Sequence, residues 1–282
     1  MSLSLEDKIR NVLKDPQIVN LITSHRFSRS KCNDDALDDI YDGLGYQKHF
    51  KNGSILIHPL NFSVSFNTDG VHAGPSCSVN KTIWPISVTL NELPYEERRK
   101  HVMLAGPYAG SKHPYMNTFL EPFVQQLNKR STLGMKWQTS AGIEVVSKVI
   151  PLCAIVDSPA RASMLNMNSH TARPYGCTFC YQKTEPTVKD RRFSGRKISP
   201  LRTHDSISAD MLQAYEERNH PNKNERRYKG FWGPSVLMNC NFFDLANGFV
   251  ADYMHGLLGV VEQHIEILFQ SQTKKKKLDS CG

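Results

Sequence analysis

The sequence predicts an α/β protein with one mixed sheet at its core. Three observations lead to this fold class. Apolar segments with the composition and periodicity of strands come first, a segment with helical periodicity follows them, and a segment rich in valine and isoleucine comes after that helix. The early strands can form an antiparallel meander, and the helix supplies the crossover that a parallel fourth strand requires.

The N-terminal region is predicted to be helical and then acidic. Apolar residues recur at roughly helical spacing through residues 1–30, with Pro16 as an interruption. The segment 32–46 contains five aspartates together with turn formers. Residues 1–50 are therefore expected to form a helical and acidic lead-in to the core.

Four strands are predicted in the first half of the core. Residues 54–58 and 62–66 come first, and in the second of these apolar residues alternate with serines, which is typical of a strand buried on one face. Residues 83–90 repeat the alternation with larger side chains. Residues 102–108 form the last of this group and end at a Gly-Pro pair.

A change of period marks the crossover. Residues 115–128 carry apolar side chains at helical spacing, and Asn117 is expected to cap that helix. Residues 143–156 return to a β-rich composition. Ser158 is then expected to cap a second helix that has Pro159 at its first position.

A right-handed crossover can lay the strand that ends near residue 156 beside the strand that ends near residue 68. Three antiparallel strands followed by a helix and a parallel strand form the topology of the ribonuclease H-like fold. We predict this fold, in partial form, for residues 51–168.

Two aspartates follow apolar strands at the points where these strands emerge into solvent. Asp69 comes after residues 62–66 and Asp157 after residues 143–156. Two carboxylates at the ends of neighbouring strands repel each other, and a divalent cation relieves that repulsion. The alternative is that each aspartate merely begins a turn, as Asp-Gly and Asp-Ser-Pro sequences often do.

Composition limits the classes to which the chain can belong. Its 282 residues are 39% hydrophobic and 22% charged, so most of the chain is expected to fold. It has no apolar run of about 18 residues, and its N-terminus lacks the apolar core of a signal peptide. We therefore expect no membrane association. Seven cysteines, scattered except for one pair, suit a reducing compartment with a metal site better than a disulfide framework.

The formal net charge of +8 points to polyanionic partners, nucleic acid first. The basic side chains concentrate in a segment, 169–240, that is expected to be a largely irregular insertion. Between residues 186 and 203 the basic residues are Lys189, Arg191, Arg192, Arg196, Lys197 and Arg202. These side chains either contact phosphates or lie in solvated loops. Residues 241–282 are expected to form an apolar helical segment with a basic tail.

Cys177 and Cys180 form a CxxC motif, in which two thiolates on a tight turn can hold one zinc ion from one side. A redox pair is the alternative, although redox CxxC motifs begin a helix after a strand. Zinc needs two further ligands. The candidates are His170, His204, His255, His264 and Cys240. His255 is favoured because Asp252 and His255 share one face of an otherwise apolar helix; alternatively, Asp252 caps this helix and His255 bonds back to the protein.

Several short stretches occur together in a characteristic order. They are Asn67-Thr68-Asp69-Gly70, Ile83-Trp84-Pro85-Ile86, Asn91-Glu92-Leu93-Pro94, Met-Asn-Thr-Phe-Leu at 116–120, Pro-Phe-Val at 122–124, Asp157-Ser-Pro-Ala-Arg161, Tyr175-Gly-Cys177-x-x-Cys180, and Asp252-Tyr-Met-His255 followed by Gly-Leu-Leu-Gly-Val-Val261. This set resembles the eukaryotic cut-and-paste transposases of the CACTA/Mirage/Chapaev (En/Spm-like) group, which are distantly similar to the V(D)J recombinase core. The resemblance runs from about residue 38 to 269.

The resemblance implies a DDE-type DNA transposase that cleaves and joins phosphodiesters with two metal ions. Asp69 and Asp157 would be its first two catalytic aspartates and the ligands of Mg²⁺ or Mn²⁺. Cys177 and Cys180 would belong to a Zn²⁺ site, with His255 as a further ligand. The residues expected to face DNA phosphates are Arg161, Lys189, Arg191, Arg192, Arg196 and Lys197. The implied partners are transposon-end and target DNA, the implied location is the nucleus, and a homodimer is allowed.

One element of the family pattern has no counterpart here. The third catalytic acid of the family is a glutamate well beyond the DxxH motif, and Glu185, Glu262 and Glu266 do not lie in that context. We therefore expect a transposase or a truncated, inactive derivative of one. The first alternative is a non-catalytic, zinc-stabilised nucleic-acid-binding module derived from a transposase. The second is an unrelated metal-dependent hydrolase of small phosphate esters.

Overall fold

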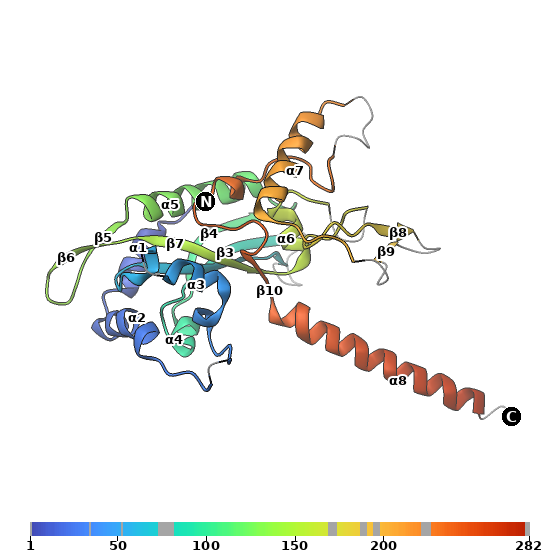
Figure 1. Ribbon diagram of the computed structural model, residues 1–282, viewed down its shortest axis with the longest axis horizontal. Coiled ribbons are helices and arrows are strands. Elements are labelled where there is room, and N and C mark those ends of the chain that lie inside the picture. Colours follow the sequence, from blue (N-terminus) through green and yellow to red (C-terminus); the bar gives the residue numbers. More distant parts are fainter. Residues whose placement is uncertain are drawn as a thin grey trace.

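A computed structural model describes residues 2–33, 35–51, 53–72, 82–168, 174–186, 191–193, 198–220 and 227–279, with side chains as far as Phe269. The chain has a mixed α/β fold in which helices cover both faces of one sheet (Figure 1). The strands of this sheet are β1 (Phe62–Thr68), β2 (Val71–His72), β3 (Thr82–Leu90), β4 (Met103–Gly110), β7 (Val149–Val156) and β10 (Phe249–Ala251).

The sheet contains antiparallel and parallel pairs. Its order is β10-β7-β1-β3, with β4 on the far side of β3, and β2 pairs with β3 beyond the end of β1. The β1–β3 and β3–β4 pairs are antiparallel, whereas β1–β7 and β7–β10 are parallel. The prediction that the crossover strand lies parallel to β1 is confirmed.

The remaining elements pack around this sheet, except for the last helix, which extends away from it. The helices are α1 (Leu5–Val12), α2 (Pro16–Ser28), α3 (Leu44–Phe50), α4 (Tyr95–Lys100), α5 (Met116–Thr132), α6 (Ser158–Met164), α7 (His204–Glu217) and α8 (Gly259–Asp279). Short turns of 3₁₀-helix are η1 (Ile40–Asp42), η2 (Ile55–Ile57) and η3 (Val236–Asn239), and η4 (Met254–Leu258) is a turn of π-helix. Two small hairpins pair β5 (Met135–Gln138) with β6 (Glu144–Ser147) and β8 (Thr184–Pro186) with β9 (Arg191–Phe193).

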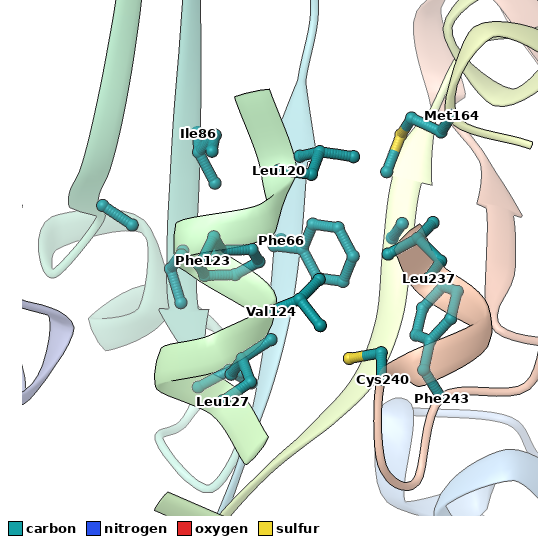
Figure 2. Close-up of a cluster of buried hydrophobic side chains, with 14 of the residues drawn as sticks. Phe66, Ile86, Leu120, Phe123, Val124, Leu127, Met164, Leu237, Cys240 and Phe243 are labelled. Atoms are coloured by element: carbon teal, nitrogen blue, oxygen red, sulfur yellow. The ribbon is translucent and has the colours of Figure 1, made fainter. Parts of the chain in front are cut away.

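The main core lies between the sheet and α5 (Figure 2). The ring of Phe66 on β1 contacts Phe123 of α5, with ring centroids 5.2 Å apart, and Phe243, at 5.6 Å. Leu237 and Cys240 are buried beside Phe243 in the same cluster. Side chains from the segment after α7 thus pack directly on the sheet beside α5.

The opposite face of the sheet is covered by the N-terminal region. Tyr41, Tyr46 and Leu56 pack with Ile150 of β7 in a second cluster. The acidic segment therefore ends in buried aromatic residues and is part of the fold.

Two strand predictions were wrong. Residues 54–58 contain η2 instead of a strand. Only Leu56 of this short apolar stretch is buried, and it packs against Ile150 of β7 without pairing with a strand. The expectation that β1 has one exposed face was also wrong. Ser63 and Ser65 are buried, because Ser63 Oγ donates to Glu92 and Ser65 Oγ donates to the side-chain oxygen of Asn91.

Both helix caps were also misassigned. Asn117 lies inside α5, where its side chain bridges to the carbonyl of Pro234 and the backbone N–H of Val236. Asp157, and not Ser158, is the N-cap of α6. The side chain that caps a helix depends on where the preceding strand ends, and β7 continues to the residue before Asp157.

α8 extends away from the body of the molecule (Figure 1). Its apolar side chains from Val260 to Phe269 are about half exposed or more. Among the residues that the structure describes, no helix combines the length and the apolar character needed to cross a bilayer.

Candidate catalytic site

Three aspartates follow the carboxyl ends of three adjacent parallel strands. Asp69 comes directly after β1, Asp157 after β7 and Asp252 after β10. Parallel strands end at the same edge of a sheet, so the residues that follow them gather there.

The register places the three aspartates at one level. Phe66 pairs with Ala154, and Ala251 pairs with Val156. Continuing this register puts Asp69 on one side of Asp157 and Asp252 on the other. Neighbouring strands lie about 4.8 Å apart, so adjacent carboxylates are within reach of a shared cation.

A side-chain bond ties the ends of β1 and β7 together. Asn67 Nδ2 donates to the carbonyl oxygen of Ile155 over 2.5 Å. Asn67 lies two residues before Asp69, and Ile155 lies two residues before Asp157. The bond therefore holds the backbones that carry both aspartates at a fixed separation.

Each of the first two aspartates also has a local role. Asp69 Oδ1 accepts the backbone N–H of Gly70 at 2.6 Å, and Asp157 Oδ1 accepts that of Ala160 at 2.7 Å. Only glycine fits after Asp69, because a Cβ at residue 70 would lie 2.6 Å from the ring of Trp84. Each carboxylate thus makes one local bond, and its second oxygen is left for other contacts.

Asp252 and His255 form a linked pair beside these aspartates. Asp252 Oδ1 accepts the backbone N–H of His255 at 2.8 Å and lies 3.0 Å from its Nδ1. Burial opposes ionisation of Asp252, but these bonds from His255 outweigh it and hold the pKa of Asp252 below its usual value. The hydrogen bond to Asp252 in turn raises the pKa of His255, and the charges of Asp157 and Asp69 add to that effect.

The sequence reasoning missed the position of Asp252 at this edge. It assigned His255 to zinc binding or structural support and offered Asp252 as a helix cap, whereas the β7–β10 register brings Asp252 to the strand ends that carry Asp69 and Asp157. The signal was present, because Asp252 follows the short apolar run Phe249-Val-Ala251, just as Asp69 and Asp157 follow theirs. Across the ranges that the structure describes, no three His, Cys, Asp or Glu side chains converge tightly enough to hold a metal ion as they stand.

We expect the pKa of His255 to lie above its ordinary value of 6.5, and to fall in Asp252→Asn. Because the folded-state pKa is raised, the contact stabilises the fold below the ordinary pKa, and this contribution is lost as the pH rises through the folded value. An NMR titration of the imidazole in metal-free buffer measures this shift. Asp69→Asn should lower the pKa by less, and Asp205→Asn, an exposed change on α7, should leave it unchanged. An unaltered pKa in Asp252→Asn would contradict the arrangement.

The cysteine pair lies in a separate part of the fold. The Sγ atoms of Cys177 and Cys180 are 3.4 Å apart, which suits two thiolates on one metal ion as well as a disulfide precursor. Arg202 holds the loop, since its Nε donates to the carbonyl oxygens of both cysteines at 3.2 Å. The two thiols that the CxxC spacing predicted to meet are therefore brought together.

The other zinc candidates are engaged elsewhere. The ring of His204 accepts the backbone N–H of Leu245, and His264 contacts the carbonyl of Val260 in its own helix. Cys240 is buried in the main core, and burial raises the pKa of its thiol to about 12. His170 lies outside the described residues. The charges that act on His255 are those of Asp252, Asp157 and Asp69, so its assignment to the cysteine site is not supported.

Arg161 requires a correction. Its side chain is only 3% exposed, and its Nη2 donates to the carbonyl oxygens of Thr178 and Ala246. Its guanidinium stacks on the ring of Phe179, 3.8 Å from the centroid, and burial lowers its pKa to about 10. A guanidinium held in this way cannot reach a DNA phosphate. Arg161 instead joins α6 to the cysteine loop and to the segment before β10.

The basic segment is only partly described. Arg191 bonds the hydroxyl and the carbonyl of Thr184, and so closes the β8–β9 hairpin. Arg192 on the same hairpin is exposed. Lys189, Arg196 and Lys197 lie outside the described residues, so their predicted contact with DNA stays a prediction.

No model of a known protein family matches this chain, and no curated protein matches it either. The site and the sequence motifs are therefore what supports a function.

Proposed function

We propose that this chain carries the catalytic core of a DDE-type DNA transposase on a ribonuclease H-like sheet. The observation that carries the proposal is the register of Asp69 and Asp157, on adjacent parallel strands at the centre of the sheet. The strand order supports the fold, since β1, β3 and β4 form an antiparallel meander and β7 and β10 continue the sheet in parallel with β1.

The donor set suits a hard divalent cation. Carboxylate oxygens are the ligands that Mg²⁺ and Mn²⁺ prefer. Asp69 and Asp157 would hold the cation, and Asp252 is the residue best placed to add a third carboxylate. Its Oδ2 is buried without a hydrogen-bond partner in the described part of the chain, which is costly unless something binds there.

The residues of the chain would act by positioning and by charge. Bound at these carboxylates, divalent cations would supply the positive charge that activates water or a 3′-hydroxyl and stabilises the leaving oxygen. Asp69 and Asp157 supply fixed negative charge on rigid strand ends, which costs no reorganisation during the reaction. The hydrogen bond to Asp252 raises the pKa of His255, which favours the protonated imidazole beside the aspartates.

A zinc site at Cys177 and Cys180 is part of the same proposal. The two Sγ atoms provide two of the four ligands of a tetrahedral zinc site. No third ligand lies beside them among the described residues, so the other two would come from elsewhere. The net charge of +8 and the exposed Arg192 favour DNA as the partner.

The second candidate is a non-catalytic, zinc-stabilised nucleic-acid-binding module with the same fold. It is favoured by the approach of the Cys177 and Cys180 Sγ atoms to 3.4 Å, and by Glu185, Glu262 and Glu266 not lying in the context of the third acid of the family. Its predicted signature is bound zinc and DNA affinity without cleavage.

The deciding experiment compares three activities of the wild-type chain. Nicking of a supercoiled plasmid in Mg²⁺ or Mn²⁺, abolished by EDTA, supports the transposase core. Zinc content and DNA affinity without nicking in either cation support the binding module. Turnover of a generic small phosphodiester without DNA affinity would overturn both and favour a hydrolase of small esters.

A further inference from the structure

A cleft of about 420 Å³ opens between α5 and the β3–β4 edge of the sheet. Aromatic and apolar side chains form its walls, and Lys112 and His113 lie at the loop that leads into α5. No carboxylate is among the residues that line it. The aromatic residues that matter most are Tyr108, Tyr115 and Phe119, and Tyr115 is 89% exposed.

The cleft lies at the same end of the sheet as the aspartates. Its wall residue Ile86 pairs with Thr68, the residue before Asp69. The ring of Trp84 connects the two places, because it contacts the His113 ring edge-to-face, with centroids 5.3 Å apart, and also lies against Gly70. A single indole thus separates the cleft from the Asp69–Gly70 turn.

The mouth of the cleft suits a phosphate. Lys112 is exposed there. No side chain caps the N-terminus of α5, and Asn117, which could have done so, is bonded to the segment before η3. Free N–H groups and the helix dipole therefore add to the positive charge of Lys112.

We propose that this cleft receives an unstacked nucleobase of DNA and that Tyr115 stacks on it, with Lys112 on the adjoining phosphate. The inference rests on the proposed function and adds a base subsite to it. Aromatic walls and a flanking cation are the features that bind single bases with little sequence preference. The enzyme must place one particular phosphodiester at its metal ligands. A base held in the cleft sets the position of the DNA strand along the protein, so the phosphodiester at a fixed distance from that base reaches the metal ligands.

The test measures binding of the full chain to a short fluorescent single strand in buffer without Mg²⁺ or Mn²⁺, so that no cleavage occurs. One nucleotide at a time is replaced by an abasic site. We expect one position at which the missing base weakens binding by about 10-fold. Tyr115→Ala should weaken binding of the intact strand by a similar factor. The affinity of this variant should not fall further when the abasic site is at that position, because both changes remove the same contact.

Matched controls separate this effect from general loss of affinity. Tyr95→Ala removes an exposed tyrosine from α4 and should retain the full abasic effect. Lys112→Gln should reduce the dependence of log affinity on log salt by about 0.7, as expected for one phosphate contact on a single strand. Free dAMP, tested as a competitor, shows whether the cleft prefers a mononucleotide.

Three outcomes would overturn the subsite. In the first, the losses of affinity caused by Tyr115→Ala and by the abasic site add together. In the second, an abasic site weakens binding at no position. In the third, dAMP displaces the DNA equally well wherever the abasic site lies. Since binding is measured without a divalent cation, it is independent of nicking. Metal-dependent nicking without the position effect would leave the catalytic proposal standing and reject the cleft alone.

Discussion

Replacing Asp69 with asparagine is expected to reduce Mg²⁺-dependent nicking of plasmid DNA more than about 100-fold. Mutating a residue that only supports a metal ligand typically lowers metal affinity or activity about 10- to 100-fold, so removing the charge of a ligand itself should lower activity more. Asparagine keeps the oxygen that accepts the N–H of Gly70, so the turn and the fold should be retained.

Asp157→Asn should give the same loss for the same reason. Asn and Asp are equally good N-caps, so α6 should keep its cap when residue 157 loses its charge. Circular dichroism and a melting curve confirm that each variant folds. Nicking by gel electrophoresis in Mg²⁺ and in Mn²⁺ measures the activity.

Asp205→Asn is the matched control, because it removes one carboxylate from an exposed position in the first turn of α7. Its nicking rate should equal that of the wild type. Asp252→Asn tests whether a third carboxylate acts at this edge, and a loss close to that of Asp69→Asn is expected. Nicking that persists in both Asp69→Asn and Asp157→Asn would rule out the proposed site.

Arg26→Met is expected to lower the free energy of unfolding by about 3–5 kcal/mol. The side chains of Arg26 and Glu92 are fully buried, with Nη1 and Oε1 3.4 Å apart. Glu92 also accepts the N–H and the hydroxyl of Ser63, and Arg26 donates to the carbonyls of His58 and Asn61. Without the guanidinium, a buried carboxylate is left without its counter-charge.

The loss should depend on pH. Burial raises the pKa of Glu92, and Arg26 opposes that shift, so removing Arg26 raises the pKa further. A carboxyl with a raised folded-state pKa contributes stability when it is protonated, and that contribution falls as the pH rises from the unfolded value through the folded value. Arg26→Met should therefore be more destabilised at neutral pH than near pH 4.

Urea denaturation followed by circular dichroism measures this prediction. Adding Glu92→Gln to Arg26→Met should recover part of the loss, because the uncompensated charge is removed. Lys136→Met breaks an exposed pair with Glu144 and should cost less than about 1 kcal/mol. Equal losses in Arg26→Met and Lys136→Met would show that burial of the first pair has no energetic consequence.

Regular elements with long apolar patterns were predictable from the sequence. The strand that became β3 shows strict alternation, and α5 shows helical spacing over several turns, because each buries one continuous face. The rule that an aspartate directly after an apolar segment lies at a strand end placed Asp69 and Asp157 correctly. The crossover argument then placed the two strands side by side, which the register confirms.

Shorter elements and buried polar groups depended on partners far away in the chain. β10 has only three residues and is a strand because β7 pairs with it. The apolar run before Asp252 is therefore a weaker signal than the longer runs before Asp69 and Asp157. Arginine is a residue type that often binds phosphates, so the sequence favoured that role for Arg161. Its carbonyl partners and the ring of Phe179 come from segments that only the fold brings together.

The sequence by itself determined the class of fold, the order of the central strands and two of the three strand-end aspartates, because these follow from local periodicity. The tertiary structure alone decided which polar side chains are buried, where the third aspartate lies and that an aromatic cleft opens at the same end of the sheet. A charged or polar group takes its role from what surrounds it, and these surroundings are supplied by residues distant in the chain.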